Sequence, residues 1–283
     1  MSASLPEWPA KKPDFESPPV SEVAISVQFE PIQGLNPFHI GRLWEESYRK
    51  QYPSAEQKAP LPYVIEKFGK PEKGETGISI LQGVPPVRHW FYNKKGTELI
   101  QIQNDKFVFN WRQTKKREKY PRYEDVIKKY KRHLKKFIAF LKANEIGELV
   151  PNQCEVTYVN AVGRETGASS HAKVADFIAP WSGRTSDDFL GQPEEVDIRT
   201  SYLMCGEDQV PLGRLHISLE PRSLVETDEP YYRFVLSARG APLEPTIKAV
   251  GDFSDFARQY VIRAFASFTS KKAHKVWRRI DDT

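Results

Sequence analysis

This sequence of 283 residues contains only two cysteines, Cys154 and Cys205, and no apolar run approaching the roughly 18 residues that a membrane span requires. Two cysteines make neither a disulfide framework nor a zinc site, so we expect both to be small buried hydrophobic residues. The N-terminus also lacks the basic and apolar regions of a signal peptide. We therefore expect a soluble protein of the cytoplasm, with no membrane partner.

The short signatures of the large enzyme classes are missing as well. The sequence has no glycine-rich phosphate loop, no HExxH or paired CxxC motif, and no GxSxG element. Its histidines are scattered rather than clustered. We accordingly predict no metal and no cofactor and favour a non-enzymatic role, while an enzyme built from scattered residues stays open.

Positive charge, by contrast, is concentrated in one segment. Eleven Lys or Arg residues and three acidic residues lie between 115 and 136, a net charge of +8, so the rest of the chain nets −3 within a total of +5. Three interpretations stay open: contact with RNA or DNA, docking to an acidic protein, and an ordinary solvated helix face. The candidate partner-binding residues are Lys115, Lys116, Arg117, Lys119, Arg122, Lys128, Lys129, Lys131, Arg132, Lys135 and Lys136.

Proline content and hydrophobic periodicity divide the chain into three parts. Residues 1–19 contain five prolines and no apolar periodicity, which is typical of an extended arm. For residues 20–150 we predict a strand at 20–30, a helix between Asn36 and Pro53, strands at 63–68 and 78–92, a hairpin at 98–112 and a helix at 122–144. For residues 151–283 we predict a strand at 154–162, a short helix at 172–178, strands at 196–204, 213–220 and 231–239, and a helix at 253–268.

Both halves thus run strand, helix, antiparallel strands and long helix. A sheet covered on one face by its long helix buries the apolar surfaces of both. We predict an α+β fold that repeats this unit in tandem, in the manner of TATA-binding-protein-like or helix-grip folds, with the halves packed as one body. The analogy concerns shape and carries no function.

A set of polar residues lies on predicted strands and on the helix that follows them. Two interpretations of this polar floor stay open: a structural network in which Arg112 pairs with Glu155, and a site for a ligand or partner. Its members are Gln101, Gln103, Asn110, Arg112, Tyr123, Glu155, Tyr158 and Asn160.

A second polar set alternates with apolar residues along one predicted strand. Arg214, His216, Ser218 and Glu220 share one face, and Leu215, Ile217 and Leu219 share the other. Acid and base chemistry around His216, with Asp197, Arg199 and Arg233 nearby, is one interpretation. We favour the simpler one, the solvated outer face of an antiparallel sheet.

Five stretches, at 18–31, 99–112, 120–123, 155–160 and 264–278, together resemble a sporadically distributed, uncharacterised bacterial protein family of roughly this length. The resemblance covers nearly the whole chain and implies a bacterial source and a patchy distribution, but no activity. It departs at the end, where the sequence runs from His274 to Arg278 without the glycine that the family places after Trp277.

Three hypotheses of function follow. The first is a binding protein with a macromolecular partner, such as an accessory or immunity-type component of a bacterial defence or toxin–antitoxin system. The second is an RNA- or DNA-binding protein that uses residues 115–136. The third is a nucleotide-related enzyme that uses Arg112 and Glu155 of the polar floor.

Overall fold

A computed structural model describes residues 4–9, 11–69, 87–115, 118–163, 171–183, 185, 187, 189–191 and 193–280. Its elements are β1 (Asp14–Phe15), β2 (Val20–Phe29), α1 (Pro37–Leu43), the π-helical η1 (Trp44–Tyr48), β3 (Ser54–Lys58), β4 (Arg88–Tyr92), β5 (Glu98–Gln103), β6 (Lys106–Arg112), α2 (Tyr123–Ala143), β7 (Pro151–Val162), the 3-10 helix η3 (His171–Asp176), β8 (Ile198–Cys205), β9 (Pro211–Ser223), β10 (Pro230–Gly240), α3 (Ile247–Phe268), α4 (Lys271–Val276) and β11 (Arg279–Ile280).

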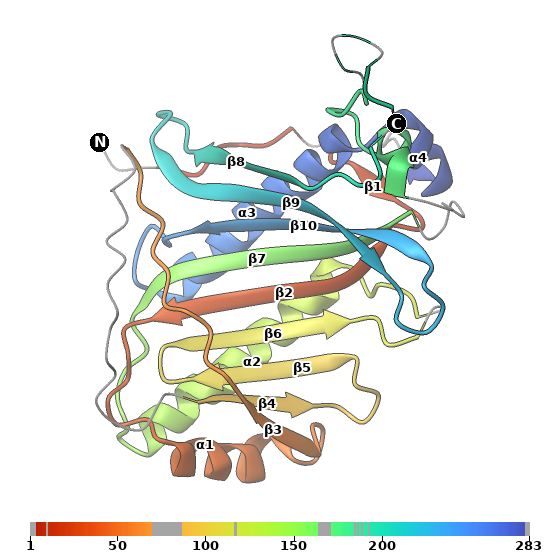
Figure 1. Cartoon of the computed structure of the whole chain (residues 1–283). Helices are drawn as coiled ribbons and strands as arrows, with labels where there is room; N and C mark the ends of the chain where they lie inside the picture. Colours follow the sequence, from red (N-terminus) through yellow and green to blue (C-terminus); the bar gives the residue numbers. More distant parts are fainter. Residues whose placement is uncertain are drawn as a thin grey trace.

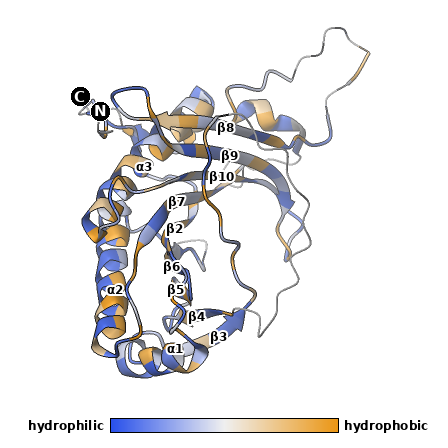
Figure 2. Cartoon of the chain, turned by 90° about the vertical axis from the view of Figure 1, so that its left-hand side faces the viewer, coloured by the Kyte–Doolittle hydropathy of each residue, from blue (hydrophilic) through white to orange (hydrophobic). Residues whose placement is uncertain are grey.

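One antiparallel sheet organises the described part of the chain. Its nine strands follow the order β3-β4-β5-β6-β2-β7-β10-β9-β8, and α2 and α3 lie side by side against one of its faces (Figure 1). The predicted α+β class and the antiparallel arrangement of the strands are therefore confirmed. The sheet curves away from the helices, which leaves its other face concave (Figure 2). We call this second surface the concave face.

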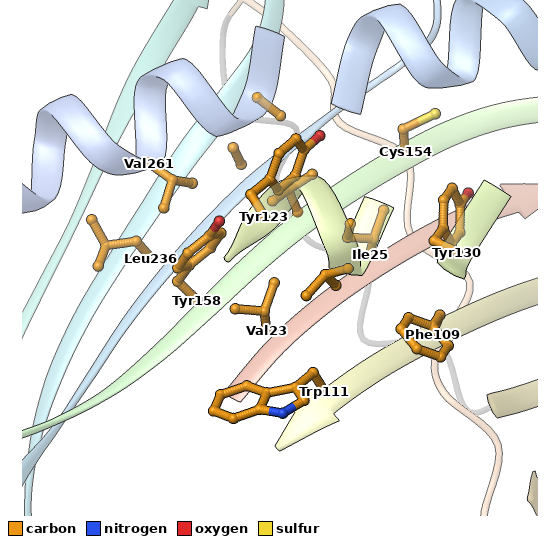
Figure 3. Packing of buried hydrophobic residues seen from close by; sticks show 14 of the residues in the cluster. Val23, Ile25, Phe109, Trp111, Tyr123, Tyr130, Cys154, Tyr158, Leu236 and Val261 are labelled. Atoms are coloured by element: carbon orange, nitrogen blue, oxygen red, sulfur yellow. The ribbon is translucent and has the colours of Figure 1, made fainter. Parts of the chain in front are cut away.

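Alternation of apolar and polar residues decides which side chains meet the helices. In β2, Val23, Ile25 and Val27 are fully buried, and each lies opposite an aromatic residue of β6. From α2, Tyr130 and Phe137 pack on Phe107, with ring centroids 6.1 and 5.7 Å away. Figure 3 shows part of this layer, in which side chains of the sheet and α2 interlock. Each fully buried side chain of this size contributes about 1.5–3 kcal/mol relative to exposure.

Several predicted elements differ from the structure in instructive ways. The stretch 63–68 is not a strand, because the chain from Ala59 onwards leaves the sheet and crosses its concave face. The strand β3 was not predicted, since all five of its residues are exposed and carry no apolar signal. Residues 78–86 of another predicted strand lie outside the described residues, and the remainder forms β4.

At the ends of the chain, the predicted arm is fixed to the body. Its β1 pairs with β11, and Phe15 is buried against Phe265 and Trp277. The last predicted helix starts earlier than expected, at Ile247, because Thr246 caps it by accepting a hydrogen bond from the Ala249 amide. Cys154 is buried as predicted, whereas Cys205 is only partly buried, and both thiols are free.

Candidate functional site on the concave face

An extended segment lies across the concave face like a strap. Residues 59–69, which we call the strap segment, follow β3 and run over β5, β6, β2 and β7 (Figure 1, orange trace). In Figure 2 this segment stands on the side of the sheet opposite to the helices. It has no regular secondary structure, so its backbone groups must find partners elsewhere.

Three buried glutamines of the sheet supply those partners. Gln103 accepts from the Leu61 amide at 2.9 Å and donates to the Leu61 carbonyl at 3.1 Å. Gln28 accepts from the Val64 amide and donates to the Val64 carbonyl, both at 3.0 Å. Gln153 accepts from the Glu66 amide at 3.2 Å. Each carboxamide thus binds backbone groups of the strap segment, as the backbone of a neighbouring strand would. These contacts depend on the conformation of the strap segment rather than on its side chains.

The spacing of these glutamines matches an extended polypeptide. Gln103 lies opposite Lys106, which lies opposite Gln28, which lies opposite Gln153, so all four residues form one row across four strands. Two strand spacings separate Gln103 from Gln28, about 9.6 Å. Three extended residues span about 9.3–10 Å. The distance between Gln103 and Gln28 therefore matches the distance between every third residue of an extended chain that crosses the strands.

Charge anchors the far end of the strap segment. The Glu66 carboxylate, only 5% exposed, forms ion pairs with Arg214 and with Arg239, the latter at 3.3 Å. It also lies 2.6 Å from Nε2 of His216. Because removing one partner of a buried ion pair leaves uncompensated charge, Glu66 is the most costly residue of the strap segment to replace.

Beneath the strap segment is a polar cavity of about 280 Å³. One wall is a chain of hydrogen bonds across four strands: Arg88 donates to Gln101 at 2.9 Å, Gln101 to Asn110 at 2.7 Å, and Asn110 to Glu22 at 2.6 Å. Lys106 lines the cavity and donates to the Pro62 carbonyl at 2.8 Å, and burial lowers the pKa of its ammonium group. The cavity is suited to polar groups.

The predicted polar floor is divided between the two faces of the sheet. Gln101, Asn110 and Glu155 line the cavity under the strap segment, and Gln103 holds the strap segment itself. Tyr123, Tyr158 and Asn160 lie on the helix side, where they border a different cavity. The prediction of a shared floor was wrong because Glu155 and the pair Tyr158 and Asn160 occupy odd and even positions of one strand, β7, and so point to opposite faces.

The pairing of Arg112 with Glu155 was also wrong. Strand β2 separates β6 from β7, so these two residues are not on adjacent strands. Arg112 donates instead to the Gly96 carbonyl at 2.8 Å and lies 5.0 Å from the Tyr92 ring centroid. Glu155 pairs with Arg239. The two residues on which the enzyme hypothesis depends therefore do not meet.

The second polar set alternates along β9 as predicted, but part of it is covered. Arg214 and His216 bind Glu66 of the strap segment, so the interpretation as an open solvated face holds only for the far end. There, Glu220 pairs with Arg222 at 2.6 Å and with Arg233 at 3.8 Å. Asp197 pairs with its neighbour Arg199 at 3.3 Å.

Helix α2 divides the predicted basic residues between its sides. Lys129 pairs with Glu98 at 2.6 Å, and Lys136 donates to the Ser47 carbonyl at 3.4 Å, so both turn toward the N-terminal half. Arg122 binds the arm through Asp14 at 2.9 Å. Four cations remain together on the exposed side and line a shallow hollow, namely Lys128, Lys131, Arg132 and Lys135. We call these four the α2 basic face.

The loop before α2 contributes less to this surface than the sequence suggested. Lys115 and Lys119 are exposed, and no ion pair of either is found within the described residues. Lys116 and Arg117 lie outside the described residues. The basic segment is thus a helix face of four cations with separate flanking charges.

No family model matches this chain, and no curated protein matches it. Within the described residues, no group of three His, Cys, Asp or Glu side chains is placed to hold a metal ion. None of the described helices combines the length and apolar composition needed to cross a bilayer.

Proposed function

We propose that this chain is a binding protein that recognises an extended segment of a partner polypeptide on its concave face. The observation that carries the proposal is the row of glutamines, each of which binds the backbone of the strap segment. Extended peptides are commonly bound through their backbone groups, with pockets for alternate side chains supplying specificity. The strap segment supplies the pattern of such a ligand from within the chain.

The preferred partner segment follows from the side chains that the strap segment places against the sheet. Leu61 and Val64 turn inward, whereas Tyr63 and Ile65 are 44% and 42% exposed. Glu66 enters the cluster of Arg214, His216 and Arg239. The ligand is thus an extended segment with two apolar residues three positions apart, followed two positions later by an acidic residue.

A tethered segment competes with any partner. The strap segment follows β3 directly, which keeps its local concentration in the millimolar range or above. A partner must therefore bind more tightly, or at more points, than the strap segment does. The accessory or immunity-type role suggested by the family resemblance would work through such a contact.

The proposal predicts that weakening the strap segment opens the concave face to a peptide. We expect a labelled peptide of residues 59–69 to bind the Glu66→Ala protein at least about tenfold more tightly than the wild type, because this change weakens only the tethered competitor. Fluorescence anisotropy measures both affinities. The same peptide with alanine at its own glutamate position should bind the Glu66→Ala protein at least about tenfold more weakly than the unchanged peptide does.

The matched controls are two variants made in the Glu66→Ala background. His216→Ala removes a partner that only the glutamate of the peptide still has in this background and should reduce the gain in peptide affinity, whereas Gln51→Ala, on the exposed surface, should leave it unchanged. Equal affinity of the peptide for the wild type and the Glu66→Ala protein would show that the strap segment is only a structural connection.

We also propose that the two halves are copies of one unit, of the TATA-binding-protein-like kind. The strand orders β3-β4-β5-β6-β2 and β8-β9-β10-β7, read inward from opposite edges, both end on the first strand of their half. Each half then closes with a long helix, α2 or α3. The second half has one strand fewer, and η3 stands where the first half has α1.

A second candidate function is the binding of RNA or DNA by the α2 basic face. The observation in its favour is that its four exposed cations follow helical spacing on one side of α2. Among them, Lys131 lies 4.0 Å from Asp255, at the limit of an ion pair. Such a face suits a phosphate backbone, and its test is given in the Discussion.

A further inference from the structure

The N-terminal arm closes a second cavity, on the helix side of the sheet. The arm is held there by Arg122, which donates to the Phe15 carbonyl at 3.0 Å, and by Trp8, which packs on Tyr260 with ring centroids 5.1 Å apart. The cavity encloses about 200 Å³ between the arm, the start of α2, α3 and strands of the sheet centre. Nothing in the proposed function uses it.

One side of its wall is apolar. Val20, Leu236, Val261, Ile262 and Phe265 line it, and Figure 3 shows Leu236 and Val261 close to Tyr158. An apolar cavity of about 150 Å³ in another protein is large enough to hold benzene. A cavity of this size and lining therefore accepts a single aromatic ring with a small substituent.

Hydrogen-bond donors gather at one end. The hydroxyl groups of Tyr120 and Tyr158 lie 2.9 Å apart. Beside them is Arg258, whose guanidinium lies 4.6 Å from the Tyr123 ring centroid and 3.3 Å from Glu124. The Arg258 Nε is buried and has no hydrogen-bond partner within the described residues. A ligand oxygen at this end of the cavity would therefore meet donors from Arg258, Tyr120 and Tyr158.

The same end favours a negative ligand over a neutral one. The cavity lining includes three cationic side chains, Lys12, Arg122 and Arg258, against the carboxylates of Asp14 and Glu124. Burial raises the pKa of Tyr158, so its hydroxyl stays protonated and can donate. A planar guanidinium and a carboxylate have matching geometry.

We propose that this cavity binds a small aromatic monocarboxylate, with its ring between the sheet and α3 and its carboxylate at the Arg258 guanidinium and the Tyr158 hydroxyl. The site is independent of the concave face, from which the whole sheet separates it. Because the arm forms one wall, a bound molecule would also fix the arm on the body.

Calorimetric titration of the full chain with phenylacetate and with its neutral analogue 2-phenylethanol tests this site. We expect phenylacetate to bind at least about tenfold more tightly, since its carboxylate can accept charge-assisted hydrogen bonds that the neutral alcohol cannot. Arg258→Gln and Tyr158→Phe should each remove that preference and leave 2-phenylethanol binding nearly unchanged. Arg42→Gln, on exposed α1, serves as the matched control.

Two outcomes would overturn the proposal. One is the absence of phenylacetate binding up to about 10 mM, which is weaker than a ligand of this size needs for a specific site. The other is an unchanged preference for phenylacetate in both variants. Tyr158→Phe keeps the ring and its packing, so it remains informative even if Arg258→Gln destabilises the contact with Tyr123.

Discussion

Reversing the charge of the α2 basic face is expected to abolish binding to a short duplex DNA. With Lys128, Lys131, Arg132 and Lys135 on four phosphates, the logarithm of the wild-type affinity should fall with the logarithm of salt concentration with a slope of about −3.6. That slope corresponds to a loss of about 150-fold between 50 and 200 mM salt. The variant with glutamate at all four positions should show no binding at 50 mM, measured by anisotropy.

The control must change the net charge equally. Glutamate at Lys94, Lys95, Lys271 and Lys275 does so on exposed positions away from α2 and should leave most of the affinity and the slope intact. If both quadruple variants lose binding alike, the attraction is a property of overall charge. If wild-type protein does not bind duplex DNA at 50 mM salt, the nucleic-acid candidate fails and the α2 basic face is a solvated surface.

Acid is expected to destabilise this protein through one buried histidine. His133 on α2 is fully buried, its ring stacks on Phe109, and its Nε2 lies 3.0 Å from the Tyr52 hydroxyl. Burial, followed by the charges of Arg132, Lys136 and Lys129, lowers its pKa from 6.5 to about 3. The unfolded chain therefore binds a proton before the folded chain does, and stability is lost as pH falls from about 6.5 to about 3.

The size of this effect follows from the two pKa values. The free energy of unfolding should be about 2 kcal/mol lower at pH 5 than at pH 7, and about 4 kcal/mol lower once pH reaches 3, from His133 alone. Urea denaturation of the wild type and of His133→Phe at both pH values measures it. The variant should lose most of the difference between pH 7 and pH 5.

The comparison depends on the change with pH rather than on stability itself. His133→Phe loses the contact with Tyr52 and starts from a different stability at pH 7, which does not affect that change. His39→Gln on α1, outside the core, should retain the wild-type dependence. An unchanged pH dependence in His133→Phe would assign the loss to other groups.

Local pattern was sufficient for much of the fold. Periodicity placed α2 within a residue of its ends, because Val126, Tyr130 and Phe137 recur at helical spacing and all three are buried. It also placed the hairpin of β5 and β6, where Asn104 and Asp105 form the turn. These elements are decided by residues close together in the chain, which is the information that pattern contains.

The candidate site depends on contacts that pattern does not contain. Gln28 meets Val64 and Gln153 meets Glu66 across 36 and 87 residues of chain, and glutamine carries no periodic signal of its own. The predicted pair of Arg112 and Glu155 was inferred from the polar faces of two strands. The pattern of neither strand reveals that β2 lies between them or that Glu155 pairs with Arg239. The prolines at 60 and 62 were the available hint, since proline is unfavourable in a central strand.

The pairing of β2 with β7 also determines how the chain can be divided. These are the strands through which the two halves meet in the described sheet. A polypeptide that ended at Gly147 would carry β2 with an uncovered backbone edge, and such edges readily join other chains. Two pieces made together would cover one another, so we expect this protein to behave as a split protein, whose fragments aggregate singly and reassemble when mixed during folding.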